Sequence, residues 1–212
     1  MSMQTTTTTP KERPILFSAP MVRAILEDRK TQTRRIAKPF NPPEFDAEII
    51  HRTDHCEFIG WSGGTPSLDF TKDYYPAGTC ILCPYGKPGD RLWVRESFFW
   101  DGPRIAYRAD HEGYAPKDTP WKPSIYMPRA ASRILLEITD VRAERLQDIS
   151  EADAIAEGVE KWPDGNYKAY GKHAGKYSNA RDSFFSLWQD INGTESLQQN
   201  PFVWRINFKR IN

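Results

Sequence analysis

Three segments in which apolar and polar residues alternate constrain the fold of this chain most. They cover residues 91–98, 132–146 and 202–211. Successive side chains point to opposite faces of a β-strand, so each segment is typical of a strand with one face in the core. Long stretches rich in proline and glycine separate these segments, and helical periodicity is confined to short runs. The pattern predicts a mixed α+β domain built around a small β-barrel with short flanking helices.

Three short helices are expected beside these strands. One covers residues 19–28 and has Pro20 in its first turn. A second begins after Ser150, which is a good N-cap, and ends at Gly158, which suits the left-handed position after a helix. The third covers residues 181–191, where apolar residues recur on one helical face.

The length of 212 residues fits one domain with long insertions. We expect a flexible N-terminal tail over residues 1–12 and a single domain over residues 13–212. The segments without long periodic patterns predict insertions in this domain at about 39–85, 99–131 and 159–200.

The net charge of +1 excludes a global basic field of the kind that drives non-specific binding to nucleic acid. Any contact with RNA or DNA must therefore come from a local basic patch. No apolar run approaches the roughly 20 residues that a membrane span needs, so we expect no membrane partner and a cytoplasmic location. The sequence leaves the oligomeric state open.

The three cysteines do not form a disulfide framework, which fits a reducing compartment. Cys80 and Cys83 form a Cys-x-x-Cys pair, and Cys56 with His51 or His55 would complete a set of four zinc ligands. A second pair at the spacing of known zinc sites is missing, however. We therefore expect no metal site and no cofactor.

The highest local positive charge lies between Arg23 and Lys38, where six basic residues face two acidic ones. The planar fork of arginine pairs well with phosphate oxygens, and Thr31, Gln32 and Thr33 add neutral donors. The stretch predicts a site for phosphate or nucleic acid. A solvated basic turn after a helix is the alternative interpretation.

The run from Ile25 to Arg35 (Ile-Leu-Glu-Asp-Arg-Lys-Thr-Gln-Thr-Arg-Arg) resembles the signature of the ASCH-domain family, which belongs to the PUA-like superfamily. Three further pieces resemble that family in the same order along the chain: the Gly-Asp-x-Leu strand at 89–94, the glutamate-bearing helix at 149–157 and the closing strand at 203–209. In this core the chain is similar to the family's bacterial N4-acetylcytidine amidohydrolase. As a whole it resembles ASCH proteins of tailed phages and prophages. The resemblance implies a PUA-like β-barrel.

The resemblance also implies catalytic roles for Lys30, Thr33 and Glu157. In the amidohydrolase a lysine accepts a proton, a threonine three residues later is the nucleophile, and a helix glutamate donates a proton. A threonine hydroxyl is a weak nucleophile that needs a base beside it, and a lysine serves as one only if burial or nearby cations lower its pKa. Residues i and i+3 share a face on a turn but not on a strand, so Lys30 and Thr33 can cooperate only if this segment is a turn.

Asp28 stands where the family signature has a glycine. A carboxylate close to Lys30 would raise the pKa of the lysine and oppose its use as a base. Asp28 can instead point away and cap the turn. The sequence allows both arrangements.

Binding of a nucleic acid or a modified base also requires cations and a stacking aromatic near the site. The aromatic residues that could stack on a base, judged by their position along the chain, are Trp93, Trp100, Tyr107, Trp121 and Tyr126. The residues that we expect to bind substrate or nucleic acid are Arg29, Thr31, Arg34, Arg35, Trp93 and Arg95.

Three functions follow from these observations. The first is an enzyme that removes an acyl group from a cytidine-like base, or a related hydrolase such as a ribonuclease, with RNA, DNA or a modified nucleoside as substrate. The second is a non-catalytic PUA-like module that binds RNA or a modified base. The third is a phage accessory protein that keeps only the fold and works in the host cytoplasm. An enzyme requires Lys30, Thr33 and Glu157 to converge, whereas a binding module requires only the arginines and an aromatic.

Overall fold

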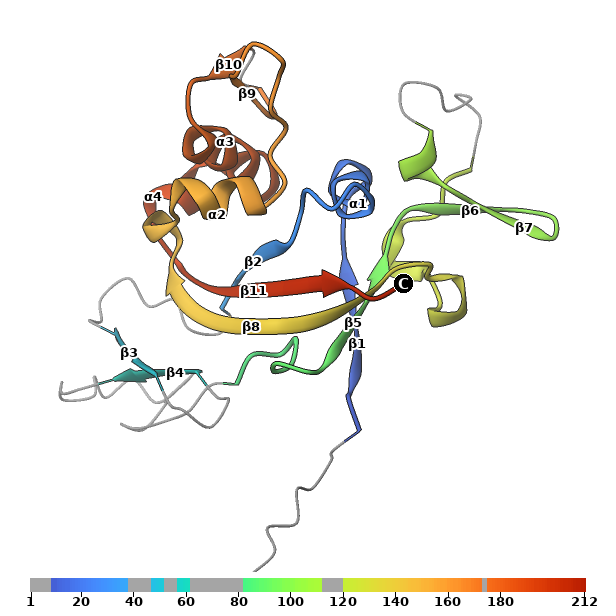
Figure 1. The fold of residues 1–212 in the computed structure, drawn as a ribbon, viewed down its shortest axis with the longest axis horizontal. Coiled ribbons are helices and arrows are strands. Elements are labelled where there is room, and N and C mark those ends of the chain that lie inside the picture. The colour runs from blue at the N-terminus through green and yellow to red at the C-terminus, as the bar shows by residue number, and fades with distance from the viewer. Residues whose placement is uncertain (1–8, 38–46, 52–56, 62–81, 112–119, 173–174) are drawn as a thin grey trace, which may run out of the picture.

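The computed structural model has a curved five-stranded sheet at its centre, in the order β1-β5-β8-β11-β2 (Figure 1). The structure describes residues 9–37, 47–51, 57–61, 82–111, 120–172 and 175–212. The strands of the sheet are β1 (Glu12–Leu16), β2 (Gln32–Ile36), β5 (Arg91–Arg95), β8 (Leu135–Arg145) and β11 (Phe202–Arg210).

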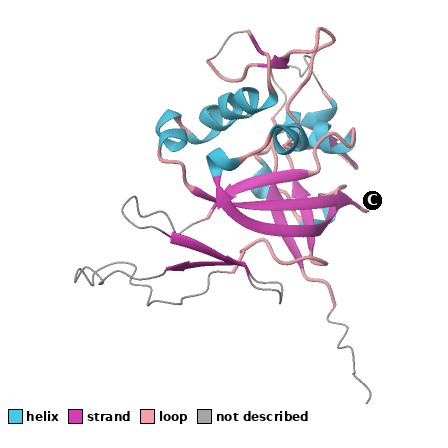
Figure 2. Cartoon of the chain, turned by 60° about the vertical axis from the view of Figure 1, so that its left-hand side comes forward, coloured by secondary structure: helices cyan, strands magenta, loops and turns pink. Residues whose placement is uncertain are grey.

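Within these described ranges, four short helices accompany the sheet: α1 (Ala19–Leu26), α2 (Glu151–Ala156), α3 (Ala180–Asn192) and α4 (Thr194–Gln198). Figure 2 shows the helices gathered beyond one side of the central strands. Three two-stranded sheets are formed by β3 (Ala47–His51) with β4 (Glu57–Trp61), β6 (Phe98–Asp101) with β7 (Arg104–Tyr107), and β9 (Tyr167–Lys168) with β10 (Lys176–Tyr177). The 3-10 helices are η1 (Arg108–Asp110), η2 (Ser124–Tyr126), η3 (Arg129–Ala131) and η4 (Leu146–Asp148).

The strand directions make the sheet mixed. β1 pairs with β5 in parallel, and the other pairings are antiparallel. The long pairing of β8 with β11 changes register after Asn207, as at a β-bulge, and bulges bend a strand. Within the described residues the edge strands β1 and β2 do not pair, but the Arg35 guanidinium on β2 donates a 2.6 Å hydrogen bond to the Leu16 carbonyl at the end of β1. The α+β class is confirmed, and closure into a PUA-like barrel stays a prediction.

The first hydrophobic core lies between α1 and the concave face of the sheet. On β11 the side chains of Phe202, Trp204, Ile206 and Phe208 have exposed fractions of 3 %, 0 %, 0 % and 4 %, as the alternation in the sequence predicts. Full burial of one such side chain stabilises the fold by about 1.5–3 kcal/mol. These contacts hold β2 and α1, which carry the candidate site, against the rest of the sheet.

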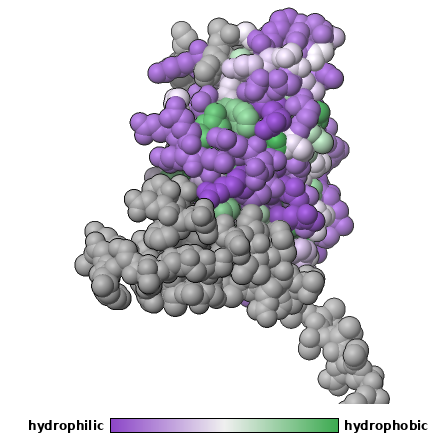
Figure 3. All heavy atoms as spheres, turned by 90° about the vertical axis from the view of Figure 1, so that its left-hand side faces the viewer, coloured by the Kyte–Doolittle hydropathy of each residue, from purple (hydrophilic) through white to green (hydrophobic). Residues whose placement is uncertain are grey.

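A second core lies under α2 and α3. Phe184 and Trp188 of α3 are buried there, together with Val203 of β11. The helix surface on this side is mostly hydrophilic, with a small hydrophobic patch (Figure 3). The segment 159–200, predicted as an insertion, therefore contributes a packed core and not only surface.

The first two strands differ in detail from what the sequence suggests. β1 begins at Glu12, inside the predicted tail 1–12, because it pairs with β5, which lies far away in the sequence. A turn over residues 30–33, which would place Lys30 and Thr33 on one face, is not formed, because Lys30 precedes β2 and Thr33 lies within it.

The predicted strand 91–98 is divided between β5 and β6. The chain leaves β5 after Arg95, and the next residue, Glu96, is buried in an ion pair with Arg133 whose N···O distance is 2.9 Å. From Phe98 onward the chain pairs with β7 instead of continuing the central sheet. Most of the predicted insertion 39–85 lies outside the described residues. No helix in the described part of the chain is long and apolar enough to span a membrane.

Asp90 ties the start of β5 to β1, and this contact generates a stability prediction. Its carboxylate accepts hydrogen bonds from the Lys11 N–H at 3.0 Å, from Arg13 at 2.9 Å and from the Lys87 N–H at 3.3 Å. Burial raises the pKa of Asp90, but these hydrogen bonds outweigh it and hold the pKa below the ordinary value of 3.8. A carboxyl group with a depressed pKa stabilises the fold above its unfolded pKa and loses that effect as the pH falls through its folded pKa.

We expect Asp90→Asn to lower the free energy of unfolding at pH 7 by about 1–3 kcal/mol, because it removes charge-assisted hydrogen bonds. The difference from wild type should shrink as the pH falls below about 4. Urea unfolding at both pH values measures it. Asp148→Asn, at an exposed position of η4, is the control and should change stability by less than about 0.5 kcal/mol. A loss that is equal at pH 7 and pH 3 contradicts the prediction.

Candidate functional site

The connection between α1 and β2 places Lys30 against the end of α2. The Arg29 and Lys30 N–H groups both donate to the Ala24 carbonyl, at 2.8 and 2.9 Å. The next N–H, of Thr31, donates to the Ala156 carbonyl of α2 at 2.9 Å. The backbone of this connection is thus fixed to two helices at once, which positions the lysine before any side-chain contact is made.

The helix that carries Glu157 is short and well capped. Ser150 and Asp153 form a capping box at its start, as the sequence predicts for Ser150. Glu157 is the C-cap, and Gly158 follows with a positive φ of 85°. The backbone N–H groups of Glu157 and Gly158 are bonded to the carbonyls of Asp153 and Ile155, so the end of α2 fixes the position of Glu157.

Lys30 and Glu157 form a buried ion pair. The Lys30 Nζ donates to Glu157 Oε2 at 2.7 Å and to the Glu157 backbone carbonyl at 2.7 Å. The side chains of Lys30 and Glu157 are 0 % and 5 % exposed. Burial lowers the pKa of Lys30; the charge and hydrogen bond of Glu157 oppose this, and Arg35 and Arg34 lower it further. The net effect is a lowered pKa, which is the condition under which a lysine can exchange a proton.

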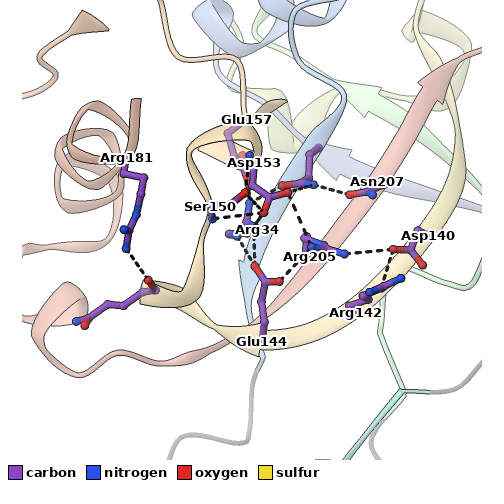
Figure 4. Close-up of polar contacts among 12 residues, drawn as sticks. Arg34, Asp140, Arg142, Glu144, Ser150, Asp153, Glu157, Arg181, Arg205 and Asn207 are labelled. Carbon is purple, nitrogen blue, oxygen red and sulfur yellow. Dashed lines mark hydrogen bonds and ion pairs between the residues drawn. The ribbon is translucent and has the colours of Figure 1, made fainter. Parts of the chain in front are cut away.

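A network of charged side chains fixes the other carboxylate oxygen of Glu157 (Figure 4). Arg34 Nη1 lies 3.2 Å from Glu157 Oε1 and donates to Gln32 Oε1 at 2.6 Å. Arg34 Nε donates to Glu144 Oε1 at 2.8 Å. Both oxygens of Glu157 therefore face a cation.

The network continues across the sheet to β11. The Gln32 amide donates to Asp153 at 3.0 Å and to Asn207 at 2.7 Å. Arg205 lies 3.4 Å from Glu144 and 3.8 Å from Asp153. Each member contacts residues on another element, so α2, β2, β8 and β11 are held in one arrangement around Glu157.

A pocket of about 360 Å³ opens beside this network. Thr33, Arg34, Arg35 and Glu157 give it a polar side. The remaining lining is largely apolar and includes Met21 and Tyr85, together with Phe184, Leu187 and Trp188 of α3. Small-molecule sites commonly have volumes of about 300–1,000 Å³ and combine an apolar lining with a few polar groups.

Two of the three predicted catalytic residues line this pocket. Thr33 and Glu157 do so, while Lys30 lies behind Glu157 and does not. Thr33 is 2 % exposed, and its hydroxyl has no hydrogen-bond partner among the described residues. The hydroxyl is therefore free to bond a ligand.

The predicted binding residues are not all brought together. Arg34 and Arg35 line the pocket. Arg29 donates a 2.7 Å hydrogen bond to Glu27, and Thr31 is exposed. Neither residue is part of the pocket lining. Trp93 and Arg95 lie on β5, where the Arg95 guanidinium sits 5.4 Å over the Trp93 ring, and they are not part of the pocket lining.

Asp28 points away from Lys30. It adopts a positive φ of 55°, which an aspartate tolerates better than most residues and which a glycine adopts freely. Its side chain is 71 % exposed and lies 3.4 Å from Arg210. Of the two arrangements that the sequence allows, the structure has the one in which Asp28 points away, and Asp28 is not among the groups that shift the pKa of Lys30.

Several residues of the site escaped sequence reasoning. Tyr85, Phe184 and Trp188 reach the pocket from segments interpreted as insertions. The only signal for the two α3 residues was their place on an apolar helical face. Glu144 and Arg205 are brought to Arg34 by strand pairing, which no local pattern indicates.

Within the described residues, no group of three or more His, Cys, Asp and Glu side chains is placed to hold a metal ion. Of the cysteines and histidines considered for zinc, Cys56, Cys80 and His55 lie outside those residues. The prediction that the protein has no metal site is therefore not tested at these positions.

Comparison with protein-family models, with curated proteins and with solved structures gives no match for this chain. The resemblance to the ASCH-domain family rests on the residues quoted above. Function has to be argued from the pocket, the ion pair and the threonine beside them.

The approach of Gly158 to Lys30 generates a second prediction. A Cβ at Gly158 would lie 2.8 Å from the Lys30 Cβ and 3.1 Å from the Ala24 Cβ, whereas Gly165, with a nearly identical φ of 87°, has nothing within 4 Å. Alanine at either position incurs the left-handed penalty of roughly 1–2 kcal/mol. We expect Gly158→Ala to lower the free energy of unfolding by about 1–3 kcal/mol more than Gly165→Ala, because the new methyl group must displace packed neighbours. Urea unfolding of both variants measures the difference, and equal losses contradict it.

Proposed function

We propose that this protein is a hydrolase that removes an N-acyl group from a modified base, with an N-acylated cytidine or a closely related nucleoside as substrate. One observation carries the proposal. The Thr33 hydroxyl and the Glu157 carboxylate line the same pocket, and the Lys30 ammonium donates a 2.7 Å hydrogen bond to that carboxylate. A nucleophile, a proton-transfer group and a second titratable group therefore lie together beside a ligand-sized space.

In the proposed reaction the Thr33 oxygen attacks the acyl carbonyl carbon, and its proton passes to the Lys30–Glu157 pair. The pair then protonates the amine nitrogen as the carbon–nitrogen bond breaks. Water hydrolyses the resulting threonine ester, which releases the carboxylic acid and restores the hydroxyl. Such a nucleophile needs a base in its vicinity, and general acid–base steps of this kind typically contribute about 10²–10⁴-fold in rate.

The ion pair is suited to move a proton. A hydrogen bond of 2.7 Å between charged groups is short, and transfer of one proton along it converts the ion pair into a neutral amine and a neutral acid. Burial favours that neutral form, because it disfavours the charged form of Lys30. In the neutral form Lys30 is the base and Glu157 the acid, which are the roles that the ASCH resemblance implies.

The lining of the pocket supports a ligand that is partly aromatic and partly polar. Aromatic side chains of Tyr85, Phe184 and Trp188 line the same pocket as the polar groups of Thr33 and Glu157. Nucleobases that are read outside a duplex are held in this way, by aromatic surfaces together with hydrogen bonds to their edges.

A second function is supported by a different observation. Lys30 does not line the pocket, and both Lys30 and Arg34 already have acidic partners. A non-catalytic module that binds RNA or a modified base needs only the pocket and its aromatic lining. In that case the ion pair would serve to position β2 against α2.

The proposal predicts that purified protein converts N4-acetylcytidine, or another member of a panel of N-acylated nucleosides and RNAs, into the free base form. Thr33→Val keeps the size of the side chain and should lower turnover by at least about 10³-fold, and Lys30→Ala should abolish it. Thr139→Val, at an exposed position of β8, is the matched control and should retain activity. Product formation followed by liquid chromatography measures all three.

The double variant Lys30→Met with Glu157→Gln distinguishes loss of the catalytic groups from loss of activity through misfolding. It leaves no unpaired charge at the ion pair, whereas removal of one partner of a buried pair costs about 3–5 kcal/mol. We expect the double variant to be folded by circular dichroism and inactive. Binding of the nucleosides without hydrolysis by the wild-type protein would favour the binding module, and absence of both binding and hydrolysis would exclude both functions.

A further inference from the structure

Arg35 differs from Arg34, which also lines the pocket, and from Lys30 beside it, in having no acidic partner among the described residues. Arg34 and Lys30 both lie within ion-pair distance of Glu157. No carboxylate among the described residues lies within 4.0 Å of the Arg35 guanidinium. Burial of this guanidinium lowers the pKa of Arg35, and the more distant charges of Tyr85 and Glu157 oppose that effect only in part.

The Arg35 side chain is nevertheless held in place. Its Nη2 donates to the Leu16 carbonyl at 2.6 Å, and its Cζ lies 5.2 Å from the centroid of the Phe17 ring. Nε is buried without an acceptor, and Nη1 has no acceptor among the described residues. The guanidinium therefore has a fixed orientation before a ligand binds. It lines the pocket and has N–H groups that are not yet hydrogen-bonded.

The neighbouring charges balance without Arg35. The ionic network around Glu157 joins four cations to four carboxylates, so its formal charge is zero. Arg35, which is half-buried, adds one positive charge to the pocket, and a charge partly removed from water without an acidic partner is unfavourable. An anionic group on the ligand would remove this imbalance. The members are Lys30, Arg34, Arg142 and Arg205 with Asp140, Glu144, Asp153 and Glu157.

We propose that Arg35 binds a phosphate group of the ligand, so that the pocket takes a nucleotide, or a nucleotide within a strand, in preference to a free nucleoside. The inference rests on the proposed function, because it assumes that a base occupies the pocket. Arginine suits this role because its planar fork matches phosphate oxygens. The apolar lining then receives the base while Arg35 receives its phosphate.

The test compares ligands that differ only in phosphate. Isothermal titration calorimetry at low salt measures the binding of cytidine, N4-acetylcytidine, their 5′-monophosphates, a short single-stranded RNA containing N4-acetylcytidine, and inorganic phosphate. Wild-type protein should bind a monophosphate about 10- to 100-fold more tightly than its nucleoside, which is the effect expected for hydrogen bonds to a charged group. RNA binding tighter than that of the monophosphate identifies a strand as the source of the phosphate, and the reverse order identifies a free nucleotide.

Variants of Arg35 assign the preference to this residue. The readout is the ratio of the two affinities measured on the same variant: Arg35→Gln should bind the monophosphate no more tightly than the nucleoside, while Arg35→Lys should keep part of the preference. Arg104→Gln, at an exposed position of β7, removes the same charge elsewhere and should keep the full preference. Thermal melts followed by circular dichroism establish that each variant is folded.

Equal affinity of the wild type for nucleosides and monophosphates overturns the role of Arg35 and leaves the proposed function standing. A preference for phosphate that persists in Arg35→Gln also overturns it. Inorganic phosphate binding as tightly as the monophosphates shows an anion site without a base and overturns the nucleotide ligand. If the wild type binds none of the nucleosides, nucleotides and RNA, the proposed function fails together with the inference.

Discussion

The buried ion pair between Lys30 and Glu157 is the interaction on which the rest of the site depends. Two charges without access to water are tolerated only where each has a close partner and their remaining hydrogen-bonding atoms are satisfied. Here the lysine also binds a backbone carbonyl, and the second carboxylate oxygen meets Arg34. This requirement fixes the distance between β2 and α2, and with it the positions of the residues that line the pocket.

Elements with local signals were predictable from the sequence. The strand β11 and the capped helix α2 are examples, because alternation and capping act between residues that are neighbours in the chain. The convergence of Lys30 with Glu157 was expected only through the family resemblance, since 127 positions separate them. The condition that residues 30–33 form a turn is not met, because pairing with β11 draws Gln32 and Thr33 into a strand.

Contacts that arise from long-range pairing had no such signal. Glu12, the first residue of β1, was expected to end a flexible tail, because the pairing of this strand is completed only by β5, which lies far away in the sequence. Tyr85 and the α3 residues Phe184 and Trp188 were assigned to insertions, although they complete the pocket. Segments without long periodic patterns are interpreted as insertions. Their contribution to a second core depends on contacts with distant residues, which the local sequence pattern does not show.

The two hydrophobic cores meet within a single strand. Val203 belongs to the core under α2 and α3, while its neighbour Trp204 belongs to the core under α1. Opening either core would expose one face of β11 and weaken the packing on the other. The two cores are therefore expected to unfold in one cooperative step. The pocket, which is lined by residues of α3 and β2, would then open only when the whole fold unfolds.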